Sequence, residues 1–120
     1  MNWLANRAGR YSTLSHIPHE TMPRFLTLDD TIVVSDNQVS ADLAGEVVIL
    51  GMREGVYFGV QAAGARIWAL LQTPRRLGDL VAMLTAEYAV PPEQCATDVL
   101  AFAEDLAGRG LVIRAVPAVQ

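Results

Sequence analysis

Two histidines are the side chains best suited by type to bind a metal or to transfer a proton. They are His16 and His19, with Pro18 between them. A proline prevents the helical turn that would bring such a pair together, and no cluster of thiols or carboxylates lies nearby in the sequence. We therefore expect a polar segment with two unrelated histidines, and neither a metal nor another cofactor.

Cys95 is the single cysteine and the strongest candidate nucleophile. Nucleophilic catalysis needs a base beside the nucleophile and a third group that orients the base. Cys95 falls within an apolar helical row, and both histidines precede residue 24. We expect a small core residue rather than a reactive thiol, and one cysteine excludes an internal disulfide.

Two pairs of neighbouring carboxylates, Asp29-Asp30 and Glu104-Asp105, were the remaining candidates for a general acid and base. Adjacent side chains diverge instead of converging, so we interpret both pairs as solvated charges. The glycines between Gly45 and Gly64 form neither a dinucleotide-binding fingerprint nor a phosphate-binding loop. The sequence therefore predicts no enzyme.

The composition is typical of one globular domain that leaves some apolar surface for a partner. Of 120 residues, 52% are hydrophobic and 18% are charged, against roughly 25% charged in typical soluble domains. The net charge of −4 gives little attraction for nucleic acid. No apolar run approaches the roughly 20 residues of a membrane span, and residues 1–22 lack the apolar core of a secretory signal. We expect a cytoplasmic protein that binds neither nucleic acid nor a membrane.

The stretch EVVILGMREGVYFGV, residues 46–60, is predicted to form a β-hairpin. Arg53-Glu54-Gly55 forms the loop, because Gly55 can take the positive φ that a short hairpin loop requires. The first strand, Glu46 to Met52, is apolar on both faces, so we expect both faces to make contacts. The second strand, Val56 to Val60, is followed by a helical pattern. Its outer edge can therefore accept an extended peptide as an added strand.

The segment before the hairpin supplies a third predicted strand at Thr31–Val34, which is β-branched throughout. A turn-rich linker follows, with a weak helical or irregular piece at Val39–Leu43. We expect a three-stranded antiparallel meander with Val56–Val60 on one edge. Residues 1–24 are interpreted as an irregular extension, 25–115 as the domain and 116–120 as a tail.

Three helices are predicted after the hairpin, over residues 61–72, 76–88 and about 92–108. The third has two apolar rows, and a helix apolar over so wide an arc touches more than one surface. The rows are Cys95, Val99, Phe102 and Leu106, and Ala96, Leu100, Ala103 and Ala107. We expect part of this helix to line a groove beside the sheet edge. A short extended segment at Leu111–Ile113 completes an α+β fold.

Three motifs in this order resemble the PqqD-like proteins, also called recognition elements of ribosomally made and modified peptides, especially the stand-alone members from lasso-peptide pathways. They are A-x-G-x-x-x-W at residues 62–68, L-x-x-L-V-x-x-L-x-x-x-Y at 77–88, and D-V-x-x-F-x-x-x-L-x-x-x-G-L at 98–111. The resemblance covers about residues 25–115. It implies a three-stranded sheet packed on three helices, in a winged helix-turn-helix arrangement that binds no DNA.

The resemblance also implies a function, which is to bind the leader of a precursor peptide and present it to a modifying enzyme, either a protease, a cyclase or a radical enzyme. In the family the leader adds antiparallel to the last strand and lies in a groove beside the third helix. The residues of this sequence that match are Val56, Tyr57, Phe58, Gly59 and Val60 on the strand, and Asp98, Val99, Phe102 and Leu106 on the helix.

Several readings of the side chains stay open beside this resemblance. Phe58 and Phe102 can equally be core residues. Arg53, Arg66 and Arg109 are candidate partners for acids of the leader. We expect a charged residue or a proline at Phe58 to abolish leader binding while the helices stay folded.

Gln61 stands where the family usually has Asn, so we expect a weaker or different cap on the first helix. Three other functions stay open: a homodimer in which the free strand pairs with its twin, a regulatory module that binds an enzyme directly, and a winged-helix DNA-binding protein. The last needs a basic recognition helix, whereas residues 94–107 contain acids and no arginine.

Overall fold

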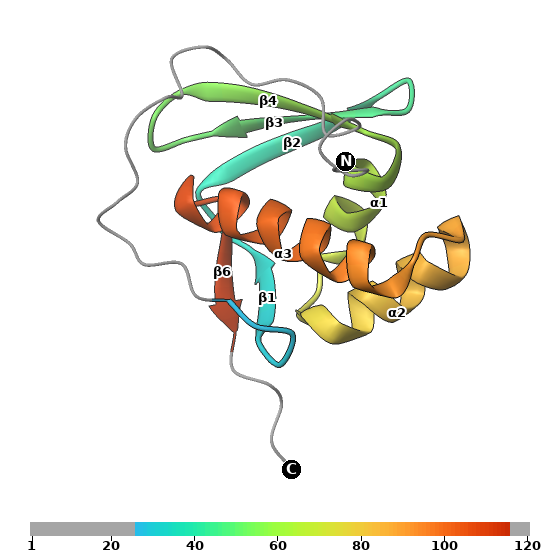
Figure 1. The fold of residues 1–120 in the computed structure, drawn as a ribbon. Coiled ribbons are helices and arrows are strands. Elements are labelled where there is room, and N and C mark those ends of the chain that lie inside the picture. Colours follow the sequence, from blue (N-terminus) through green and yellow to red (C-terminus); the bar gives the residue numbers. More distant parts are fainter. Residues whose placement is uncertain (1–25, 116–120) are drawn as a thin grey trace.

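The computed structural model describes residues 26–115, in which two small antiparallel sheets pack with three helices (Figure 1). One sheet has the strand order β2-β3-β4, and the other has the order β5-β1-β6. The strands of the first sheet are β2 (Gln38–Leu43), β3 (Glu46–Gly51) and β4 (Val56–Gln61). Those of the second are β5 (Arg75–Arg76), β1 (Thr31–Val34) and β6 (Val112–Ala115). The helices are α1 (Ala62–Leu70), α2 (Leu77–Tyr88) and α3 (Pro92–Gly108).

The α+β class, the three-stranded antiparallel sheet and the three helices are confirmed. In the view of Figure 1, α3 crosses the middle of the molecule, with the first sheet above it and β1 and β6 below it. The predicted extension 1–24 and tail 116–120 lie outside the described residues, as do His16 and His19.

The first sheet differs from the predicted meander in one strand. Residues 39–43, expected to be helical or irregular, belong to β2, which pairs with β3 from Gln38 opposite Gly51 to Leu43 opposite Glu46. The turn between them is Ala44-Gly45, with φ of 57° and 88°. Two successive positive φ angles define the tight hairpin turn whose twist matches that of paired strands. The prediction of an irregular segment was therefore wrong.

β1 is the central strand of the second sheet. It was predicted to share a sheet with the β3–β4 hairpin, and that prediction was wrong. It pairs along its whole length with β6, from Thr31 opposite Ala115 to Val34 opposite Val112. The extended segment predicted after α3 is confirmed as β6, shifted by a residue or two. Two backbone hydrogen bonds connect the end of β1 to the segments that follow α1 and α3. The N–H of Val34 donates to the carbonyl of Leu71 at 3.0 Å, and the N–H of Ser35 donates to the carbonyl of Leu111 at 2.9 Å.

The β3–β4 hairpin is confirmed, with a loop of four residues, Met52 to Gly55, rather than three. Gly55 has φ of +69°, as predicted, and its N–H donates to the carbonyl of Gly51 at 2.8 Å. Met52, expected in the strand, therefore lies in the loop and is 54% exposed. On β3 the inward side chains, such as Ile49, are buried and the outward ones are half-buried.

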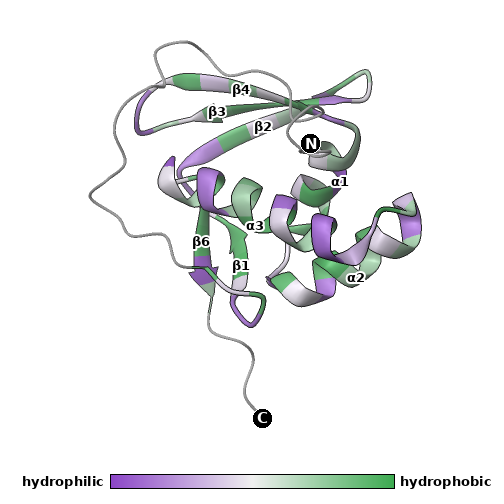
Figure 2. Cartoon of the chain, in the orientation of Figure 1, coloured by the Kyte–Doolittle hydropathy of each residue, from purple (hydrophilic) through white to green (hydrophobic). Residues whose placement is uncertain are grey.

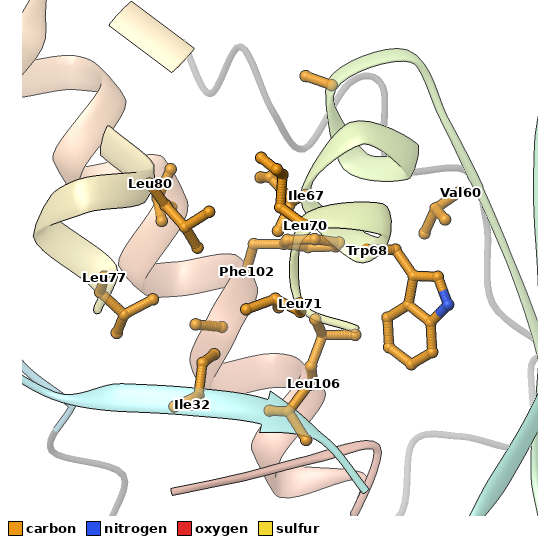
Figure 3. Close-up of a cluster of buried hydrophobic side chains, with 14 of the residues drawn as sticks. Ile32, Val60, Ile67, Trp68, Leu70, Leu71, Leu77, Leu80, Phe102 and Leu106 are labelled. Atoms are coloured by element: carbon orange, nitrogen blue, oxygen red, sulfur yellow. The ribbon is translucent and has the colours of Figure 1, made fainter. Parts of the chain in front are cut away.

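One apolar core joins the helices to the sheets. Figure 3 shows Ile67, Leu70 and Leu71 beside Phe102 and Leu106 of α3, with Leu77 and Leu80 of α2 and Ile32 of β1 around them. Figure 2 shows helices with mixed hydropathy, as expected where one face is buried and the other meets solvent. Between residues 26 and 115 no helix has the length and apolarity needed to cross a membrane.

Trp68 connects α1 to β2. The residue is 2% exposed, and its indole N–H donates to the hydroxyl of Ser40 at 3.2 Å. A buried indole N–H needs such an acceptor. The contact adds a link to the core for β2, which is held by its pairing with β3 and has mostly exposed residues.

Candidate functional site

The candidate site is the outer edge of β4. Within residues 26–115, β4 pairs with β3 on one side and has no strand on its other side. Figure 1 shows it as an outermost strand of the first sheet. This edge position was predicted from the change of pattern after Val60, and the structure confirms it. An edge strand offers main-chain donors and acceptors to which an extended peptide can add.

The side chains of β4 alternate between the core and solvent. Val56, Phe58 and Val60 are 7%, 3% and 1% exposed, so these three predicted peptide-binding residues contribute their side chains to the core. Tyr57 is 58% exposed, and Gly59 is half-buried on the same outer face. Of the five predicted β4 positions, Tyr57 and Gly59 are thus the ones that can present a surface to a peptide side chain.

The burial of Phe58 changes the expectation made for its substitution. A charged residue at a position 3% exposed would place a charge in the core, where desolvation is costly. Such a variant would lose stability as well as binding, so it cannot separate recognition from folding.

The four predicted residues of α3 face the interior. Asp98, Val99, Phe102 and Leu106 are 4%, 1%, 7% and 1% exposed, and Figure 3 shows Phe102 directed from α3 toward α1. The predicted row along the helix is therefore the row that packs in the core. Contact of these residues with a peptide stays a prediction.

Arg109 links the end of α3 to β4. Its guanidinium carbon lies 4.7 Å from the centroid of the Phe58 ring, and its Nε donates to Asp105 Oδ1 at 3.0 Å. The Arg109 side chain is only 8% exposed. The described contacts of Arg109 therefore lie inside the fold. Arg109 is not an exposed cation that an acid of the leader could pair with.

The other two arginines named from the sequence differ from each other. Arg66 forms a two-point pair with Glu87, at 3.1 and 2.8 Å, and the hydrogen bond from Arg66 lowers the pKa of the Glu87 carboxyl. Arg53 is exposed in the β3–β4 loop, and its guanidinium lies beside Gly110. Arg53 makes no ion pair with residues 26–115.

The neighbouring carboxylates have separate structural partners. Glu104 accepts a hydrogen bond from the backbone N–H of Leu26 at 3.1 Å, and Asp105 holds Arg109. Asp30 accepts from the N–H of Thr27 at 2.8 Å. This bond, and then Arg114, lower the pKa of Asp30. The side chains diverge as predicted, but each of the four carboxylates has a partner. Asp29, although 95% exposed, lies 3.3 Å from Arg76.

Cys95 is a core residue, as predicted, with no exposed surface. Its Sγ lies 3.8 Å from the carbonyl oxygen of Val81, and burial raises the pKa of its thiol. The thiolate form that nucleophilic chemistry requires is therefore disfavoured. Across residues 26–115, no three side chains of the metal-binding types come together.

Glu46, on the central strand β3, reaches this edge and was not predicted from the sequence. It lies on β3 opposite Gln61, and its carboxylate occupies the space that a Cβ on Gly59 would take. The sequence signal for this contact was Gly59, a glycine on the outer face of an edge strand, together with the acid Glu46 on the other strand of the hairpin.

The sequence of the hairpin and the helices places the chain in a known family. Residues 46–112, more than half of the chain, match the family of coenzyme PQQ synthesis protein D, and the chain belongs to this PqqD family. No curated protein matches the chain in sequence.

Two solved structures are similar. One is TbiB1 in complex with the TbiA(beta) leader peptide, at 39% identity and a TM-score of 0.63, covering 67% of this chain and 93% of that one. The other is a lasso peptide synthetase B1 complexed with the leader peptide, at 23% identity and a TM-score of 0.62, covering 68% of this chain and 96% of that one. The second likeness bears on the fold alone.

Proposed function

We propose that this chain binds the leader segment of a ribosomally synthesised precursor peptide, which adds as a strand to β4. The observation that carries the proposal is the edge position of β4 in a chain 39% identical to TbiB1, whose structure contains a leader peptide. Main-chain pairing supplies affinity that depends little on sequence, and alternate side chains of the leader supply specificity.

The bound leader is then presented to a modifying enzyme, and the chain itself performs no chemistry. The buried Cys95 and the separate partners of the carboxylates support this division of labour. The partner is a protease, a cyclase or a radical enzyme that acts on the core of the same precursor. We propose the cytoplasm as the compartment, because a ribosomally made precursor first becomes available there.

Self-association through β4 is the second candidate, since the same edge can pair with β4 of a second copy around a two-fold axis. The two uses compete for one edge. Size-exclusion chromatography with and without leader separates them, because a leader that occupies β4 dissociates such a dimer.

The direct test is calorimetric titration of the full chain with a synthetic leader, from a precursor peptide identified by reading the neighbouring genes. A scrambled peptide of the same composition is the control. We expect a dissociation constant on the order of 1 µM, which corresponds to about −8 kcal/mol. Equal binding of leader and scrambled peptide, or no binding of either, would contradict the proposal.

A further inference from the structure

The outer face of β4 has a gap in its row of side chains. Tyr57, Gly59 and Gln61 share this face, and Gly59 alone has no side chain. On β3, Val48 lies directly opposite Gly59 and is half-buried. The gap is therefore bordered by the apolar Val48 on the β3 side and by Tyr57 and Gln61 along β4.

A carboxylate reaches into this gap. Glu46 pairs with Gln61 and is thus the diagonal neighbour of Gly59 on the same face. Its carboxylate lies over Gly59, where a Cβ would otherwise stand. Glu46 is half-buried and makes no ion pair with residues 26–115.

We propose that the gap over Gly59 is a subsite for one basic side chain of the bound peptide, lysine or arginine, and that Glu46 determines this specificity. The inference rests on the proposed addition of the leader to β4. A peptide residue directly opposite Gly59 would have its Cβ about 4.5–5.5 Å from the position that a Cβ on Gly59 would take. A lysine or arginine side chain is long enough to extend from there to the carboxylate over Gly59.

The apolar surroundings of the gap favour a long basic side chain over a short polar one. The methylene groups of lysine or arginine can lie along Val48 and the ring of Tyr57, while the charged end meets Glu46. Tyr57, which is 58% exposed, offers a ring face to the same cation. An acidic side chain at this position would instead face the Glu46 carboxylate and be repelled.

The test uses the fluorescein-labelled TbiA(beta) leader peptide, in which each residue is replaced in turn by lysine, norleucine or glutamate. Norleucine keeps the aliphatic stem of lysine and lacks its charge. Fluorescence polarisation gives the dissociation constants with the wild-type chain and with the variants Glu46→Gln and Glu46→Lys. Asp42→Asn is the matched control, because it removes an equal charge from the exposed strand β2.

We expect one peptide position at which lysine binds about threefold more tightly than norleucine, as for a partly exposed ion pair. Glu46→Gln abolishes this ratio, Glu46→Lys makes glutamate the preferred residue there, and Asp42→Asn leaves the ratio unchanged. If peptides bind but no position prefers lysine, or the preference survives in Glu46→Gln, the subsite is wrong while leader binding stands. If neither this set nor the chain's own leader binds, strand addition and the subsite fail together.

Discussion

The guanidinium carbon of Arg109 lies 4.7 Å from the centroid of the Phe58 ring, which joins the end of α3 to the edge strand β4. The same guanidinium is held by Asp105, one helical turn earlier. Both partners of the contact are buried, with the Arg109 side chain 8% exposed and Phe58 3% exposed. The position of β4 relative to α3 therefore depends on a cation held inside the fold.

Arg109→Ala should lower the free energy of unfolding by about 2 kcal/mol, because a desolvated cation–aromatic contact and a partly buried ion pair are lost together. Arg114→Ala is the matched control. Its ion pair with Asp30 is more exposed, at 59% and 24% for the two side chains, so we expect a loss below about 1 kcal/mol. Urea unfolding of both variants checks this, and equal losses would show that the Phe58 contact contributes nothing.

Ala89→Gly should stabilise the protein by about 1 kcal/mol, because only glycine takes a left-handed conformation without a steric penalty. Ala89 ends α2 with φ of 53°. Ala86→Gly, at an exposed position inside the same helix, should destabilise by about 1 kcal/mol. Opposite shifts in the thermal midpoint are the expected result, and a destabilised Ala89→Gly would contradict the assigned conformation.

The helices and the β3–β4 hairpin could be predicted because their patterns are local. A helical apolar period marks α2 and α3, and Gly55 marks the hairpin loop. β2 could not be predicted, because most of its residues are exposed and its turn, Ala44-Gly45, lacks the usual Asn or Asp. The partners of β1 lie some 45 and 80 residues further along the chain, and such pairing leaves no local pattern.

Asp30 should make stability depend on pH below its ordinary pKa of 3.8. Its folded pKa is lowered by the Thr27 N–H and by Arg114, so its contribution is full above the ordinary value and is lost as the pH falls through the lowered one. Asp30→Asn should be less stable than wild type by under about 1 kcal/mol at pH 7, and the difference should vanish in acid. The control is Asp29→Asn, which removes an equal charge at a side chain that is 95% exposed. If Asp30→Asn stayed less stable than wild type in acid, this explanation would be wrong.

Tyr57→Ala should weaken leader binding about threefold to tenfold, since Tyr57 is the large exposed side chain on the outer face of β4. Leu43→Ala is the matched control, because Leu43 is equally exposed, at 58%, on the opposite edge strand β2. Titration of both variants with the same leader checks the choice of edge. A larger loss for Leu43→Ala would mean that the peptide adds to β2.

The candidate site was predictable at the level of the strand and less so at the level of side chains. The edge position of β4 followed from the change of period after Gln61, where α1 begins without a capping side-chain bond. The inward direction of Phe58, Phe102 and Leu106 depends on how the sheets and helices pack together. Burial of that kind is a tertiary property, which the spacing of apolar residues does not reveal.

Backbone N-methylation of the leader tests strand addition most directly, because it removes one N–H at a time without changing side chains. In an added strand, alternate N–H groups point toward β4 and the others point away. We predict that methylation weakens binding to the full chain at every second residue of the added segment, while the residues between tolerate it. Losses without this alternation, or no losses at all, would contradict pairing of the leader with β4.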